Sequence, residues 1–86
     1  MRAEQLLVVA QRFCEARRVR ITNYSALVAA AAAAHARIDG IAVHDNQNQE
    51  AASMYTVLTK VGALSDHNKE FANICAKIHL TVTDVA

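Results

Sequence analysis

The amino-acid sequence predicts an all-α fold, a small bundle of about four helices. Alanine supplies 18 of the 86 residues, proline is absent, and glycine occurs only at Gly40 and Gly62. This composition favours helices joined by few turns. Apolar residues also recur at intervals of three and four along most of the chain, which is the period of an amphipathic helix. A chain of this length has room for one hydrophobic core, so we expect a single helical domain over residues 1–86.

The first expected helix runs from Ala3 to Arg17. Its apolar side chains form one stripe, made of Leu6, Val9, Phe13 and Ala16. The next segment, Arg18 to Thr22, alternates basic and apolar residues and is either an extended link or one short strand. Because a lone strand is not stable by itself, a strand here would need a partner from elsewhere in the chain.

A second helix is expected through the alanine block to about Ile38. Thr22 or Asn23 can accept a hydrogen bond from its first free amides, and Gly40 suits the left-handed position just past its end. Since nearly all its side chains are small, neighbouring helices can approach its backbone closely. The polar stretch from Asp39 to Asn48 is then expected to be the longest loop.

Two further helices are expected on either side of a polar turn at residues 65–68. The third helix extends from about Gln49 to Leu64, and the last follows the turn. The apolar stripes are Met54, Val57, Leu58 and Val61 in the third helix, and Phe71, Ile74, Cys75 and Ile78 in the last. A hydroxyl of Ser65 or a carboxylate of Asp66 would cap the last helix at its N-terminus.

The charge balance argues against a nucleic-acid partner. Nine basic and eight acidic residues leave a net charge of +1, too small for the broad basic surface of a protein that binds mainly phosphates. Four arginines gather near the end of the first helix: Arg12, Arg17, Arg18 and Arg20. We interpret them as a solvated face near a helix C-terminus, where the helix dipole favours cations.

Hydropathy and cysteine usage indicate a cytoplasmic protein without a membrane segment. The longest apolar stretch, Ala26 to Ala34, is too short to span a bilayer. Cys14 and Cys75 lack CxxC spacing and fall on apolar stripes, so we expect buried free thiols in a reducing compartment.

The turn before the last helix is the most distinctive chemical feature. Helix N-termini attract anions through free backbone N–H groups and the helix dipole. Asp66 could hold Mg²⁺ there, while Asn68, Lys69 and the backbone amides hold phosphates. The alternative is a plain capping turn, because aspartate and asparagine are ordinary capping residues and lysine is ordinary surface charge.

The stretch Gly62-Ala63-Leu64-Ser65-Asp66-His67-Asn68-Lys69-Glu70 resembles the loop of the Fic/Doc family, specifically of the short Doc-like toxins of bacterial toxin–antitoxin pairs. That loop reads His-x-Phe/Leu-x-Asp/Glu-Gly/Ala-Asn-Lys/Gly-Arg and lies between two helices. Weaker similarity extends from about Glu4 to Ala72. It includes Tyr24-Ser25-Ala26-Leu27 and Gln49-Glu50-Ala51-Ala52. The resemblance implies a Fic/Doc-like core without its C-terminal helices.

The resemblance implies that Asp66 stands where the family binds Mg²⁺, and that Asn68 and Lys69 stand where it holds phosphates. Leu64 matches the apolar anchor of the loop. Three other positions depart from the family: the general-base histidine falls at Gly62, the small residue of the anion hole at His67, and the closing arginine at Glu70. Glycine cannot take a proton, and a carboxylate would repel phosphate.

We therefore expect a degenerate, catalytically inactive Fic/Doc-like protein that binds an antitoxin-like or other protein partner and forms homo-oligomers. No resident cofactor is expected. If the family activity survives, it would transfer AMP or a phosphoryl group to a protein hydroxyl with Mg²⁺ and ATP, and His67 would be a displaced base. The alternative is an unrelated small all-α protein that assembles with copies of itself and has no enzymatic activity.

Overall fold

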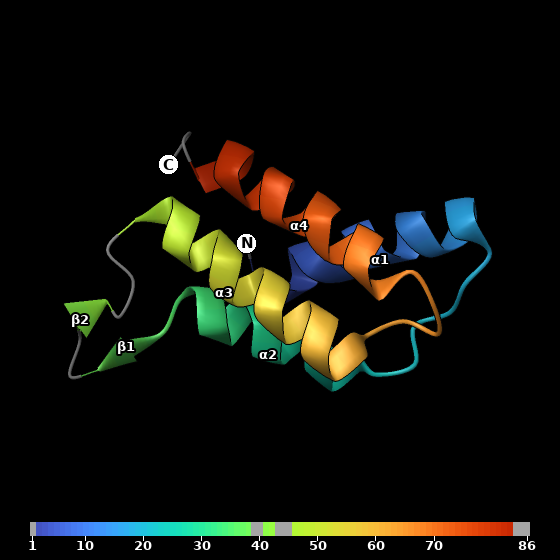
Figure 1. Ribbon diagram of the computed structural model, residues 1–86, viewed down its shortest axis with the longest axis horizontal. Coiled ribbons are helices and arrows are strands. Elements are labelled where there is room, and N and C mark those ends of the chain that lie inside the picture. Colours follow the sequence, from blue (N-terminus) through green and yellow to red (C-terminus); the bar gives the residue numbers. More distant parts are fainter. Residues whose placement is uncertain (1, 39–40, 43–45, 84–86) are drawn as a thin grey trace.

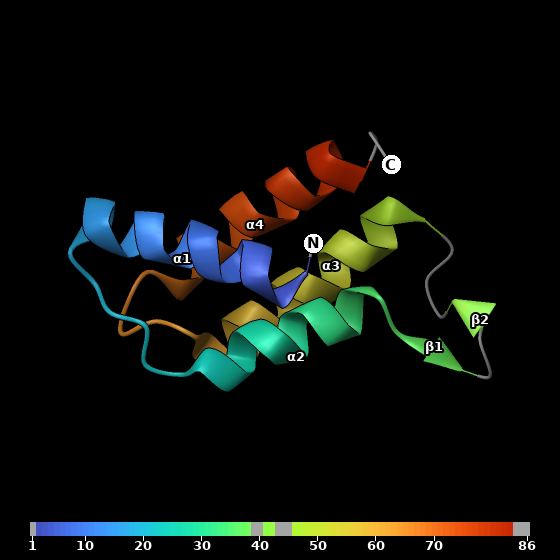
Figure 2. The same cartoon turned by 180° about the vertical axis from the view of Figure 1, so that it is seen from behind.

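The computed structural model describes residues 2–38, 41–42 and 46–83. In these residues it forms an all-α bundle of four helices, as predicted from the composition and periodicity (Figure 1). Helix α3 lies between α2 and α4, and α1 lies behind them in contact with both α2 and α4 (Figures 1 and 2). The helices are α1 (Ala3–Arg17), α2 (Tyr24–Ala34), α3 (Gln47–Val57) and α4 (Asn68–Thr83). No helix in this part of the chain is long and apolar enough to cross a bilayer.

Helix α1 has the predicted bounds, and most of its predicted stripe faces the core, but Ala16, at the end of the stripe, is exposed. Leu6, Ala10 and Phe13 are buried. At its start the Arg2 amide donates to Gln5 Oε1 over 2.8 Å. The helix ends where Arg18 adopts a left-handed conformation (φ 57°).

One residue of the connector after α1 pairs as a strand residue would, and its partner lies just before α4. Ile21 forms an isolated antiparallel bridge with Leu64. Flanking hydrogen bonds support the bridge: the Thr22 amide donates to the Ala63 carbonyl over 2.8 Å, and the Ser65 amide to the Arg20 carbonyl over 2.8 Å. The connector between α1 and α2 is thereby held against the turn that precedes α4.

Helix α2 ends at Ala34, so the prediction that it continues to about Ile38 was wrong. Its last backbone bond joins the His35 amide to the Ala31 carbonyl. Arg37–Ile38 then form strand β1, which pairs antiparallel with strand β2, Ile41–Ala42. The β-branched residues favour this pairing over a further helical turn. Gly40, the predicted C-cap, lies outside the described residues.

Helix α3 begins at Gln47, two residues before the predicted start, because Asn46 caps it. The Gln49 amide donates to Asn46 Oδ1 over 2.9 Å. The predicted loop at 39–48 is therefore shorter at this end, and it also contains β2. The helix continues as a π-helical turn, η1 (Leu58–Gly62), and ends at Gly62, which has φ +76°, instead of at Leu64.

Helix α4 carries the predicted stripe. Phe71 and Cys75 are fully buried, while Ile74 and Ile78 are half-buried against the core. The Phe71 ring lies 5.5 Å from the Phe13 ring of α1, centroid to centroid. The small side chains of α2 complete the core; those buried are Ala26, Ala30, Ala31 and Ala34.

Candidate functional site

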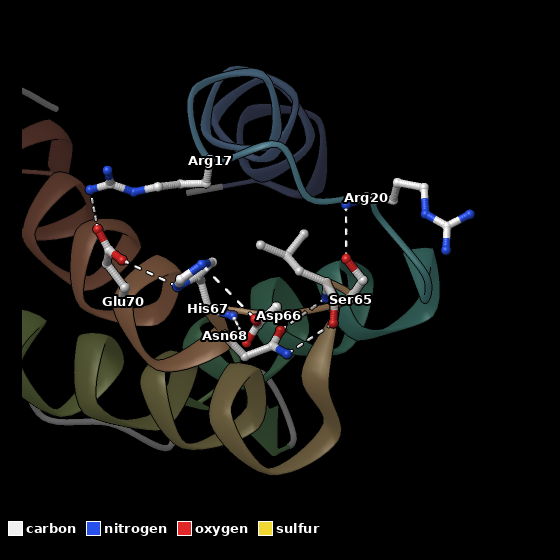
Figure 3. Close-up of polar contacts among 8 residues, drawn as sticks. Arg17, Arg20, Ser65, Asp66, His67, Asn68 and Glu70 are labelled. Carbon is white, nitrogen blue, oxygen red and sulfur yellow. Dashed lines mark hydrogen bonds and ion pairs between the residues drawn. The ribbon is translucent and has the colours of Figure 1, made fainter.

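Of the site residues that the sequence predicted, Asp66 and His67 lie in the turn between η1 and α4, whereas Gly62 ends η1, and Asn68 and Lys69 begin α4. Figure 3 shows this turn. It lies at the end of the bundle where the two long connectors meet, away from the β1–β2 hairpin (Figure 1). Asp66 and Lys69 are exposed, and the Asp66 side chain retains 77% of its accessible surface. The prediction that Ser65 or Asp66 caps α4 was wrong: Ser65 Oγ accepts from the Arg20 amide of the α1–α2 connector over 3.0 Å, and Asp66 Oδ1 accepts from the His67 amide, before α4 begins, over 2.7 Å.

Asn68 uses both ends of its side-chain amide on the backbone of Leu64. The Leu64 N–H donates to Asn68 Oδ1 over 2.9 Å, and Asn68 Nδ2 donates to the Leu64 carbonyl over 2.9 Å. The side chain therefore acts as a strand neighbour would, satisfying one donor and one acceptor of a residue that is only 4% exposed. A phosphate at Asn68 would have to compete with these bonds, and its phosphate-binding role stays a prediction.

Gly62, where the resemblance expects a general base, has a structural requirement for glycine. Its φ of +76° lies in the left-handed region, which side chains with a Cβ rarely adopt. A Cβ built there would lie 3.5 Å from Asn68 Nδ2, an ordinary contact distance. The constraint on this position therefore comes from the backbone conformation, and a histidine would be strained there.

His67 and Glu70 belong to an exposed chain of charged groups (Figure 3). His67 Nδ1 lies 3.7 Å from Glu70 Oε2, and His67 Nε2 lies 4.0 Å from Asp66 Oδ2. Glu70 is also paired with Arg17, whose guanidinium lies over the Phe13 ring at 5.8 Å from its centroid. The carboxylate that stands where the resemblance expects an arginine thus pairs with an arginine of α1.

The metal-binding role of Asp66 also stays a prediction. Within the described residues, no three or more His, Cys, Asp or Glu side chains are grouped so that they could hold a metal ion. Mg²⁺ is commonly held by one or two carboxylates together with substrate phosphates and waters. Asp66 could supply one such carboxylate, with Lys69 as a nearby cation.

A second surface feature, which the sequence did not predict, is an apolar groove between α1 and α2. It is open to solvent and has a volume of about 180 Å³. Its lining residues are Ala3, Glu4, Leu7, Tyr24, Leu27 and Val28. Tyr24 and Val28 are 60% and 59% exposed, and Val8, one turn after Glu4, is 52% exposed. The sequence gives only a weak indication of this groove. The apolar residues of each helix can be read from its periodicity, but not the fact that Leu7 of α1 and the first turn of α2 lie side by side.

The third feature is a buried histidine at the opposite end of the bundle. His79 of α4 is fully buried, and its Nε2 lies 2.9 Å from Glu50 Oε1 in the first turn of α3. The exposed His35, just after α2, places its ring 5.6 Å from the His79 ring. Burial lowers the pKa of His79, and the hydrogen bond with Glu50 acts in the other direction.

Comparison of the chain with protein-family models, with curated proteins and with solved structures found no match.

Proposed function

We propose that the protein is a catalytically inactive relative of Fic/Doc proteins that acts by binding another protein. The observation that carries the proposal is the double hydrogen bond between the Asn68 side chain and the Leu64 backbone. These two bonds use the Asn68 side chain to maintain the fold, although the family resemblance assigns this side chain to phosphate binding. Asn68 then serves as a structural lock in this chain.

Three observations support the Fic/Doc-like part of the proposal. Leu64, which matches the apolar anchor of the family loop, is buried in the core. His67 has φ 60°, a conformation that suits the small residue of the family motif at this position. The helix, turn and helix around them also follow the order of the family motif.

The loss of catalysis is supported by the charges and the backbone of the turn. Gly62 has no group that could remove a proton from a target hydroxyl, and general acid–base catalysis contributes about 10²–10⁴-fold in enzymes. Glu70 is negative where the family has a cation, and its ion pair with Arg17 leaves that guanidinium already engaged. The resemblance further suggests a bacterial cytoplasmic setting and an antitoxin-like partner.

Intact-mass spectrometry after incubation with Mg²⁺, ATP and candidate acceptor proteins tests the absence of catalysis. We expect no gain of an AMP or phosphoryl group on any acceptor. A gain that disappears in His67→Ala, and persists in the control His35→Ala, would overturn the proposal and make His67 the base. Isothermal titration with Mg²⁺-ATP, on wild type and Asp66→Asn, separates nucleotide binding without transfer from no binding.

A second candidate function is assembly with another copy of the chain through the α1–α2 groove. In a twofold dimer the same surface meets itself. The groove on this surface is lined in part by the exposed apolar side chains of Tyr24 and Val28, so these side chains of one copy can pack against the same groove of the other. The net charge of +1 opposes such a contact very little.

The size of this face fits a small, reversible interface. Helix α1 is about 22 Å long and two adjacent helices are about 20 Å wide. A standard interface buries about 800 Å² on each partner, about 15% of the 5446 Å² accessible surface of this chain. The length and width of the α1–α2 face give it an area below the roughly 800 Å² of a standard interface. An interface formed by this face alone would therefore be small.

Sedimentation velocity over a range of concentrations tests the second candidate. We expect a reversible dimer for the wild type and a monomer for Val28→Asp. Val61→Asp is the matched control, since Val61 is 54% exposed on η1, away from the groove, and should dimerise like the wild type. A wild type that stays monomeric at the highest concentration, or equal losses in both variants, would exclude this interface.

A further inference from the structure

His79 is the one buried side chain with a titratable imidazole among the residues whose burial the structure describes. It joins three helices at one end of the bundle. Its ring is 0% exposed on α4, its Nε2 contacts the Glu50 carboxylate of α3 at 2.9 Å, and its ring faces that of His35 at the end of α2. The Glu50 side chain itself is 24% exposed. The imidazole of this pair is therefore inaccessible to water, whereas the Glu50 carboxylate is partly accessible.

We propose that His79, Glu50 and His35 form a pH-sensitive clasp that holds the C-terminal half of α4 against α3 and the residue that follows α2, and releases it in mild acid. The inference is independent of the proposed function, because it concerns neither the turn before α4 nor the α1–α2 groove. It rests on the burial of the ring, its bond to Glu50 and the second imidazole beside it.

The closed state favours a neutral His79. Glu50 lies in the first turn of α3, where the helix dipole stabilises negative charge. A neutral imidazole can donate its Nε2–H to that carboxylate, so the contact needs no charge on the ring. A second proton would place a cation on a side chain that water does not reach, which is unfavourable without full compensation.

The neighbouring charges act in both directions. The Glu50 carboxylate stabilises a protonated His79 through the hydrogen bond and its charge, whereas His35 and the positive amino terminus of the chain disfavour it. Burial outweighs Glu50, and the pKa of His79 is lowered.

The direction of the pH effect follows from these charges. In an open α4 the ring is hydrated and binds a proton near pH 6.5, the ordinary value for histidine. The closed state binds that proton only at lower pH. The open state therefore takes up more protons below about pH 6.5, and the clasp is fully stable above this pH and weakens as pH falls. Each pKa unit between the two states changes the opening equilibrium about tenfold.

Amide hydrogen exchange followed by NMR on the intact chain tests the clasp directly. After correction for the intrinsic pH dependence of exchange, we expect amides of residues 74–81 to open severalfold more often at pH 5.5 than at pH 7.5. Amides in the middle of α1 should change much less. The ¹H chemical shifts of the His79 ring should titrate with a midpoint below the ordinary pKa of histidine.

Three variants make the test specific. His79→Leu fills the site without a titrating group and should remove the acid-dependent opening, while His67→Gln, which replaces an exposed histidine before the same helix, should retain it. Glu50→Gln removes the carboxylate that favours a protonated His79, so acid opening should become stronger; this variant keeps the test valid if His79→Leu does not fold. Unchanged opening in the wild type between the two pH values, or a response that persists in His79→Leu, would overturn the proposal.

Discussion

His67 holds a backbone conformation that is unfavourable for a residue with a Cβ. Its φ is 60°, in the left-handed region, which costs an L-amino acid about 1–2 kcal/mol. The ring lies within ion-pair range of Glu70 and Asp66, but these contacts are ion pairs only when the imidazole is protonated.

Replacing His67 by glycine should stabilise the protein. At pH 8, we expect His67→Gly to raise the free energy of unfolding by about 1 kcal/mol, because glycine adopts this conformation without strain. His67→Val, with a β-branched side chain, should lower it. Urea denaturation measures both changes. A glycine variant less stable than the wild type would show that the ring makes contacts worth more than the strain.

Truncation of Asn68 should destabilise the turn. Asn68→Ala removes the partners of both backbone polar groups of the buried Leu64, and a buried unsatisfied group costs about 1–3 kcal/mol. The control is Asn73→Ala, an exposed asparagine on the same helix, which should change the free energy of unfolding by less than about 0.5 kcal/mol. Equal effects of the two substitutions in urea denaturation would contradict the role of Asn68 as a lock.

At the scale of the elements, α3 owes its early start to one cap. Asn46 lies in extended conformation directly before Gln47, and its Oδ1 accepts from the Gln49 amide. Asn46→Ala should lower the free energy of unfolding by about 1 kcal/mol, since an alanine cannot accept this bond. Asn48→Ala, inside the first turn, is the control and should have little effect or a slightly stabilising one. Thermal unfolding followed by circular dichroism distinguishes the two.

Local patterns predicted the helices better than their ends. The bounds of α1 were predicted because its stripe ends where Arg18 turns left-handed. Helix α2 was predicted too long because Ala36 has high helix propensity, and the competing strand pair depends on residues later in the chain. The π-helical turn at Leu58–Gly62 was also missed, since apolar spacing does not distinguish i+4 from i+5 bonding over a single turn.

The candidate site was only partly predictable, because some of its contacts depend on how the helices pack. Its residues are contiguous in sequence, so their proximity in the turn needed no tertiary information. The bond partners of Asn68 lie four residues away, but those of Glu70 and His79 come from α1 and α3. Such pairings depend on how the helices pack, which neither composition nor periodicity specifies.

At the scale of the whole molecule, the core restricts access to one of the two free cysteines. Cys75 is fully buried, and burial raises the pKa of its thiol to about 12, so little thiolate is present at neutral pH. Cys14 is only half-buried on α1, although burial raises its pKa too. The two thiols therefore differ mainly in how far the bundle must open to expose them.

Thiol labelling should separate them. In a Cys14→Ser variant, we expect Cys75 to react with a disulfide reagent about 10³-fold more slowly than an unfolded control, because labelling requires a large opening of a domain stable by about 5 kcal/mol. The reciprocal variant, Cys75→Ser, should react faster through Cys14. Cys75 labelling at the rate of the unfolded control would show that the core is not closed.

The bridge between Ile21 and Leu64 has a consequence for how the chain folds. It joins residues 43 positions apart (64 − 21) and links the connector of the first two helices to that of the last two. Closing a segment of this length costs chain entropy before any contact is gained. The bridge therefore forms only once both halves are in place, and it couples the two helical hairpins into one cooperative unit. Loss of either half should unfold the other, so that partial domains are not populated at equilibrium.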